Sequence, residues 1–221
     1  MLSHPLDNPV WNALTGPHVR FATGAGTVRR YRPDVAPFAA AESGLAELAS
    51  ALASGDVAVV FAAPPDIPAG IDIIDPIAAT QMIAEDFLPV ASALELRPLG
   101  DSDVPQMQAL TDLTHPGPFR SRTIEMGHYL GVFDGSQLVA MAGRRMHLPG
   151  FVEISAVCTH PAYQGRGYAK ALVSAVGRQI IADGEIPFLH VRSTNSVAIG
   201  AYRSLGFKTR RELTITFTRK P

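Results

Sequence analysis

The segment ISAVCTHPAYQGRGYAKAL, residues 154–172, combines a buried strand, a glycine-containing loop and the start of an amphipathic helix. Apolar residues before the loop predict the strand, and apolar residues that recur at helical spacing after it predict the helix. Gly165 and Gly167 have no side chains, so the backbone amides of the loop can approach a ligand closely. Unpaired N–H groups at a helix N-terminus attract anions. The segment therefore indicates a site for a pyrophosphate, to which Arg166 can add a charge-assisted contact.

By itself this loop has a second interpretation, as a plain tight turn. The two common phosphate-binding motifs are absent, because the sequence contains neither a GxxxxGK[ST] P-loop nor a GxGxxG fingerprint after an early strand. This absence excludes the usual nucleotide-binding and dinucleotide-dependent classes. The choice between a turn and a ligand site then depends on the neighbouring elements.

Short strands and helices surround the segment. The upstream pattern predicts an antiparallel meander, in which Asp134-Gly135 is typical of a tight hairpin turn. Asp101 or Ser102 is expected to cap a helix before this meander. Downstream, a second helix begins at Asn195 and carries Tyr202. The strands predicted in this part cover residues 94–99, 128–133, 137–146, 151–159, 187–191 and 208–218.

Residues 1–90 predict a compact α/β segment without recognisable site chemistry. The pattern predicts helices over residues 8–14 and 42–52 and strands over residues 57–62 and 71–74. We expect this segment to pack against the C-terminal part.

The composition favours a small or locally recognised partner. The 221 residues are 47% hydrophobic and carry a net charge of −1, so no basic field exists to hold nucleic acid or an anionic membrane. The single cysteine, Cys158, cannot form an internal disulfide, which suits a reducing compartment. The sequence shows no signal peptide, no apolar run long enough to span a bilayer and no metal-ligand spacing. We therefore expect a soluble cytoplasmic protein without a metal.

Two motifs resemble the signatures of the GNAT acetyltransferases. They are Gln164-x-x-Gly167-x-Ala169 and Asn195-x-x-Ala198-x-x-x-Tyr202-x-x-x-Gly206-Phe207, in the family's order and spacing. The run at residues 153–161 and the Pro-Gly-Pro-Phe loop at residues 116–119 resemble the glycine N-acyltransferase-like branch.

The resemblance covers roughly residues 93–219 and implies an α+β fold. That fold is a mixed, mostly antiparallel twisted sheet flanked by helices, here preceded by an N-terminal α/β extension. We accordingly divide the chain into a segment of unknown role, residues 1–90, and a GNAT domain, residues 93–221. A degenerate GNAT-like half is one interpretation of the first segment.

The resemblance also implies acetyl-CoA, or another acyl-CoA, as co-substrate. Its pyrophosphate is expected on the loop amides, and its pantetheine arm is expected to pair with the preceding strand as an added strand. After that strand the sheet is expected to splay and open a cleft. The cofactor-binding residues implied are Val157, Cys158 and Thr159 on the strand, Gln164, Gly165, Arg166, Gly167, Tyr168 and Ala169 in the loop, and Asn195. For Asn195 a simple N-cap is the alternative role.

Two catalytic residues follow from the same resemblance. Tyr202 matches the family's general acid, and Glu153 stands where several members carry a general base, acting directly or through a water. The alternative for Tyr202 is core packing, and the alternatives for Glu153 are a solvated rim position and an ion pair. Cys158, beside His160, offers a covalent acyl-cysteine route. Strand alternation places Cys158 and Glu153 on opposite faces, which favours direct transfer.

We therefore expect an N-acetyltransferase in which a primary amine attacks acetyl-CoA directly in a ternary complex. The acceptor is expected to be a small amine or an amino acid. His115 is a candidate to line its site, and a plain turn histidine is the alternative. Arg120 and Arg122 are candidates to bind a carboxylate on the acceptor, and a solvated loop is the alternative. Two alternatives remain: an inactive acyl-CoA sensor, and an enzyme that acetylates protein N-termini or lysines presented by residues 1–90. A homodimer is common in the superfamily.

Overall fold

Two β-sheets and five α-helices form the part of the chain that the structure describes, residues 4–24 and 26–221 of a computed structural model. The larger sheet has eight strands in the order β4-β11-β5-β10-β9-β8-β7-β6, and the smaller has the order β1-β2-β3. The strands are β1 (Ala22–Thr23), β2 (Val28–Tyr31), β3 (Ala39–Ala41), β4 (Val57–Val60), β5 (Asp72–Ile83), β6 (Arg97–Leu99), β7 (Tyr129–Asp134), β8 (Gln137–Leu148), β9 (Phe151–Thr159), β10 (Ile186–Arg192) and β11 (Lys208–Arg219). The helices are α1 (Pro9–Leu14), α2 (Leu48–Ala51), α3 (Val104–Thr114), α4 (Tyr168–Ala182) and α5 (Ser196–Arg203), with short 3-10 helices at Pro5–Asp7, Val19–Phe21, Pro64–Asp66, Asp101–Asp103, Thr123–Met126 and Pro161–Tyr163.

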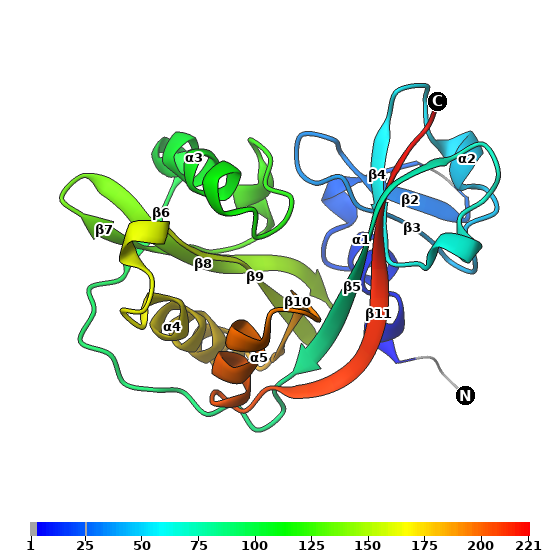
Figure 1. Cartoon of the computed structure of the whole chain (residues 1–221). Helices are drawn as coiled ribbons and strands as arrows, with labels where there is room; N and C mark the ends of the chain where they lie inside the picture. Colours follow the sequence, from blue (N-terminus) through cyan, green and yellow to red (C-terminus); the bar gives the residue numbers. More distant parts are fainter. Residues whose placement is uncertain (1–3, 25) are drawn as a thin grey trace.

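The predicted fold class is confirmed, because a mixed and mostly antiparallel sheet is flanked by helices on both faces (Figure 1). The apolar stripe of α4, which includes Leu172, Val176 and Ile180, packs with Val152 and Ile154 of β9. Met107 and Leu110 of α3 pack on the opposite face with Tyr129 and Met141.

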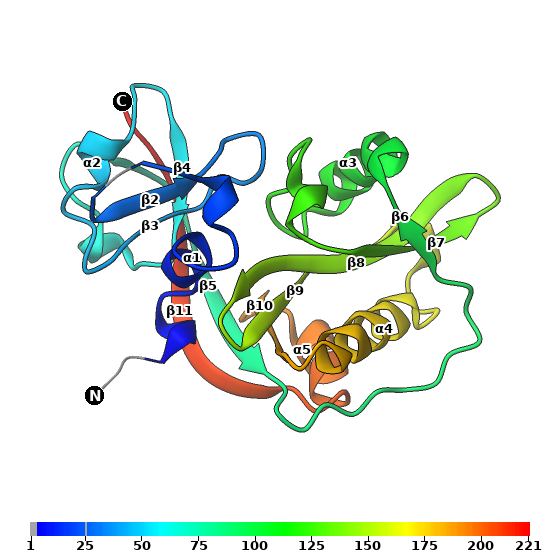
Figure 2. The same cartoon turned by 180° about the vertical axis from the view of Figure 1, so that it is seen from behind.

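The N-terminal segment covers the face that carries α3, further along the strands. Val10 and Leu14 of α1 join Met146 and Leu148 of β8 in one buried cluster. Figure 2 shows α1 beside that end of β8.

The large sheet also runs across the predicted boundary near residue 90, because β4 and β5 pair with β11 and β5 also pairs with β10. The division into domains stays a prediction.

Two N-terminal elements differ from the sequence prediction. The helix expected over residues 42–52 is only the four-residue α2, Leu48–Ala51. The strand expected over residues 71–74 continues to Ile83 as β5, through Pro76. A proline lacks the N–H that a central strand needs, but at Pro76 only β11 pairs with β5, since β10 pairs only with Ala79–Ile83.

The sheet splays between β9 and β10, as the resemblance implied. These parallel strands pair only over Phe151–Glu153 and Ile186–Phe188. Beyond these residues β10 pairs with β5 instead, and the C-terminal half of β9 keeps only β8 as a neighbour. The unpaired edge of β9 therefore faces a gap in the sheet.

Gly206 is expected to be essential for stability. Its φ is +89°, and a Cβ added there would lie 2.2 Å from the backbone oxygen of Asp86. Gly184 follows α4 with a similar φ of +80°, but an added Cβ would meet no atom within 4 Å. We expect Gly184→Ala to lower the free energy of unfolding by about 1 kcal/mol and Gly206→Ala by about 3 kcal/mol. Urea denaturation of both variants measures the difference, and equal losses would contradict the predicted collision.

Candidate active site

Two adjoining cavities lie where β9 and β10 diverge. The first, about 490 Å³, lies between the diverging ends of β9 and β10 and the end of α3. The second, about 540 Å³, lies between the loop before α4 and one side of α5. Both are lined by Val157, Cys158, Thr159, Gln164, Asn195 and Tyr202, so they form one continuous groove. Every residue predicted to contact the cofactor lines the second cavity: Val157, Cys158, Thr159, Gln164, Gly165, Arg166, Gly167, Tyr168, Ala169 and Asn195.

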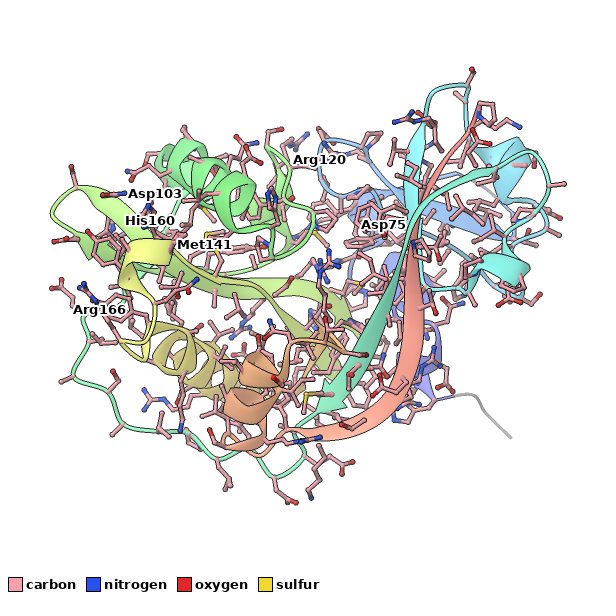
Figure 3. The ribbon with its side chains drawn as sticks, in the orientation of Figure 1. Asp75, Asp103, Arg120, Met141, His160 and Arg166 are labelled. Atoms are coloured by element: carbon pink, nitrogen blue, oxygen red, sulfur yellow. The ribbon has the colours of Figure 1, made fainter. Side chains whose placement is uncertain are left out.

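The loop before α4 has the geometry of an anion site. Gly165 and Gly167 have φ values of +77° and +79°, which favour glycine, and Gly167 is the N-cap of α4. Within the described chain, the amide of Gln164 donates to Pro161, and backbone hydrogen bonds resume only where Ala171 donates to Gly167. The amides of residues 165–170 are thus available to a ligand, beside the exposed guanidinium of Arg166 (Figure 3).

The outer edge of β9 offers a second set of contacts. Thr159 Oγ1 is buried and has no hydrogen-bond partner among the residues that the structure describes, yet it belongs to a side chain that lines both cavities. A buried polar atom without a partner is costly, so it indicates a ligand that completes the bond. Val157, Cys158 and Thr159 therefore fit an extended polar chain laid along the strand.

A β-bulge changes the side-chain alternation of β9. Gly143 pairs with Ser155 and Met141 pairs with Cys158, so three steps along β9 oppose two along β8, and Ala156 has a φ of +53°. The bulge brings Cys158 into the cluster beneath α3, on the side of the sheet to which Glu153 projects. The expectation that Cys158 and Glu153 lie on opposite faces is therefore wrong.

The chemistry of Cys158 still argues against an acyl-cysteine. The thiol is buried, and its burial raises the pKa of Cys158 to about 11. A neutral thiol is a weak nucleophile because the thiolate is the reactive form. Direct transfer is thus favoured by the thiol's protonation rather than by its position.

Glu153 is completely buried and forms an ion pair. Arg145 donates to it from Nε and Nη2, both at 2.7 Å, and His190 Nδ1 lies 2.8 Å from Oε1. Burial alone would raise the pKa of Glu153, but the charge and hydrogen bonds of Arg145 outweigh it and hold the pKa below its usual range. Arg145 and His190 line the first cavity, and Glu153 contacts that cavity only through them. The ion-pair alternative is confirmed, and the role of Glu153 as general base stays a prediction.

A chain of hydrogen bonds fixes the tautomer of His190. Arg210 can only donate, and it donates to Gln81 Oε1 at 2.8 Å. Gln81 Nε2 is therefore the donor towards His190 Nε2, at 3.0 Å. His190 Nδ1 then carries the proton towards Glu153. Burial lowers the pKa of His190, which agrees with a neutral ring.

Tyr202 and Asn195 lie where the two cavities meet. Burial raises the pKa of Tyr202 to about 12, and no described residue makes a hydrogen bond to its hydroxyl. The hydroxyl is therefore free to donate to a ligand. Asn195 Oδ1 accepts from the amide of Ala198 at 3.1 Å, so it is an N-cap that also lines both cavities.

The three residues proposed for the acceptor site do not lie together in the structure. His115 ends α3 with a φ of +49° and lines the first cavity. Arg122 instead pairs with Asp34 and Glu125. Arg120 lies near the N-terminal strands, beside a different hollow (Figure 3).

The sequence interpretation missed Arg145, His190 and Arg192, which also line the first cavity. Arg145 gave a signal, because a charge within the apolar run of residues 138–148 must find a buried partner. Over residues 4–24 and 26–221, no three His, Cys, Asp or Glu residues form a group that could hold a metal ion. Over the same residues, no helix is long and apolar enough to cross a membrane.

Comparisons match this chain to known acetyltransferases. Residues 129–215 match the family model described as FR47-like protein. A crystal structure from Novosphingobium aromaticivorans, described as an acetyltransferase from the GNAT family, is 41% identical with a TM-score of 0.92, and the match covers 99% of this chain and 100% of that chain. N-alpha-acetyltransferase RimI of Mycobacterium tuberculosis is 38% identical over 86 residues, which are 37% of this chain and 52% of RimI. An acetyltransferase of Pectobacterium atrosepticum is 31% identical over 135 residues, which are 57% of this chain and 83% of the relative. This chain thus matches about half the length of RimI.

Proposed function

Because this chain belongs to the GNAT family of acetyltransferases, we propose that it transfers an acetyl group from acetyl-CoA directly to a primary amine. The observation that carries the proposal is the continuous groove through the splayed sheet. At one end it presents free loop amides for a pyrophosphate, and at its centre it presents the unpartnered hydroxyl of Tyr202. The first feature suits the binding of acetyl-CoA, and the second suits protonation of the leaving thiolate.

Acetyl-CoA would bind along the second cavity. Its pyrophosphate would accept hydrogen bonds from the amides of residues 165–170, aided by the dipole of α4. Its pantetheine arm would lie along the free edge of β9, where Thr159 Oγ1 lacks a partner. The thioester then reaches the splay beside Tyr202.

The reaction needs a neutral amine, a donor for the oxyanion, and either a proton or stabilisation for the leaving thiolate. The amine nitrogen attacks the thioester carbon, and backbone amides at the bulge near Val157 stabilise the oxyanion. When the carbon–sulfur bond breaks, Tyr202 donates its proton to the thiolate sulfur. The amine nitrogen loses its extra proton to water, and Tyr202 is reprotonated from solvent.

Glu153 contributes to this arrangement through its neighbours. Its carboxylate orients Arg145 and His190, which line the first cavity. A carboxylate whose pKa is held low has little affinity for a proton, so we assign Glu153 to positioning ahead of base catalysis.

The acceptor is proposed to be a small amine or an amino acid, as in the glycine N-acyltransferase-like branch. The cavity of about 490 Å³ suits such a molecule. A second candidate is the acetylation of protein N-termini, supported by the partial similarity to N-alpha-acetyltransferase RimI. The free hydroxyl of Tyr202 favours an enzyme over an acyl-CoA sensor. A cytoplasmic location and a homodimer stay predictions.

An amine screen tests the proposal. Purified protein is mixed with acetyl-CoA and a panel of amines, amino acids and peptides, and free CoA is followed with a thiol reagent. We expect the release of CoA to depend on the acceptor, and we expect mass spectrometry to detect the acetylated product. Acetyl-CoA binding without release across the whole panel would contradict the transferase and support the sensor.

Reversing the charge of Arg166 is expected to weaken cofactor binding. Arg166→Glu places a negative group beside the phosphate site, so we expect the KM for acetyl-CoA to rise about tenfold with little change in kcat. Arg178→Glu is the matched control, because Arg178 is exposed on α4 but lines neither cavity. Steady-state kinetics measure both variants, and an equal rise in KM would mean that only the overall charge matters.

A further inference from the structure

The first cavity has cationic walls. Arg145 and Arg192 line it together with His115 and His190, and no aspartate or glutamate of the described residues does so. Glu153 is buried behind Arg145, and Glu212 is occupied by hydrogen bonds from Thr80 and Ser193. A site built for a simple cationic amine would instead place a carboxylate on the wall.

The two arginines keep donors for a ligand. Arg145 uses Nε and Nη2 on Glu153, while its Nη1 makes no hydrogen bond to a described residue. Arg192 is exposed and forms no ion pair within residues 4–24 and 26–221. Arg192 also stands two residues after His190 on β10, so both side chains project from the same face of the sheet.

The charge of the cavity indicates which anion fits. Glu153 balances the charge of Arg145, and His190 is neutral because its Nε2 accepts a hydrogen bond from Gln81. Arg192 then leaves about one positive charge without a partner. A carboxylate matches one charge, whereas a phosphate dianion would leave an excess negative charge in the cavity. The same positive field favours the uncharged amine that must attack the thioester.

We propose that the acceptor is an amino-acid-like amine whose carboxylate is bound by Arg192 and by Nη1 of Arg145. This inference rests on the proposed function, since it names the substrate class of the same site. Arg192 sets specificity for the carboxylate, and Arg145 is held in place for it by Glu153.

Kinetics with matched acceptors provide the first test. Each amino acid that is acetylated is compared with its amide, which keeps the amine and the side chain but lacks the charge. We expect kcat/KM to favour the amino acid by at least about tenfold. Arg192→Gln should reduce that preference to less than about threefold, and Arg192→Lys should restore part of it. Arg203→Gln, an exposed arginine of α5 that lines neither cavity, is the control.

A binding experiment tests the subsite without turnover. N-acetyl amino acids and their amides are titrated by calorimetry into the protein saturated with CoA. Tighter binding of the carboxylates by about tenfold, lost in Arg192→Gln, supports the inference. Equal binding of both forms would overturn it, and so would tighter binding of phosphorylated amines. Failure of all amines to release CoA would overturn the proposed function, and the titration would still decide the subsite.

Discussion

Tyr202→Phe is expected to lower kcat by about 10² to 10³-fold while the KM for acetyl-CoA changes less than about twofold. The ring packs against the apolar cluster beneath α4, and phenylalanine keeps that packing. The hydroxyl bonds to no described residue, so its removal should leave the stability of the fold unchanged. The loss then reports the missing proton for the departing thiolate.

The control for this variant is Tyr168→Phe. Tyr168 also lines the second cavity, but it begins α4, away from the junction of the two cavities. We expect its kcat to stay within about threefold of the wild type. A Tyr202→Phe enzyme with wild-type turnover would remove the acid assignment.

The pH profile gives a second check on Tyr202. Burial raises the pKa of this phenol to about 12, so the hydroxyl remains protonated well above neutral pH. The acid form is lost only as the pH rises through that value. Wild-type kcat should therefore show no descending limb below about pH 10.

Glu153→Leu is expected to lower the free energy of unfolding by about 3–5 kcal/mol at pH 7. The variant leaves Arg145 as a buried cation without its partner. The folded-state pKa of Glu153 is depressed, so its stabilisation is present above the unfolded value near 4.3. It is lost only as the pH falls through the folded pKa, so measurements at pH 7 report the full effect.

The double variant Glu153→Leu/Arg145→Met is the matched control. It replaces the whole buried pair with apolar side chains, so most of the lost stability should return. The preference for a carboxylate acceptor should not return, because Arg145 is absent. Equal instability of the single and double variants, measured by urea denaturation, would contradict the charge-pair explanation.

Glu153→Gln separates positioning from base catalysis. The amide keeps the shape of the side chain but cannot accept a proton from the amine. If Glu153 only positions Arg145 and His190, we expect reduced kcat/KM for the acceptor with an unchanged pH profile. If the variant instead loses the fall of kcat/KM at acidic pH, Glu153 acts as the general base.

The C-terminal half was predictable from the sequence because its signals are local. The hairpin at Asp134-Gly135 and the glycines of the loop before α4 each fix a turn within a few residues. Hydrophobic periodicity on both sides then gave strands and helices close to those observed. The residues that line the second cavity could be picked out in advance, since most of them lie in two short motifs.

The features that escaped prediction depend on distant parts of the chain. Pro76 is compatible with a strand only because β10 ends its pairing before that residue, which local sequence does not reveal. The bulge at Ala156 reverses the face on which Cys158 lies. The assembly of Arg145, Glu153 and His190 requires the pairing of three strands and has no compact sequence motif.

Calorimetric titration of the wild-type protein with acetyl-CoA tests the central claim most directly. The groove through the splayed sheet predicts saturable binding of one acetyl-CoA per chain, weakened about tenfold by Arg166→Glu and unaffected by Arg178→Glu. Absence of binding to any acyl-CoA at millimolar concentration would contradict the assignment of the loop, the groove and the reaction built on them.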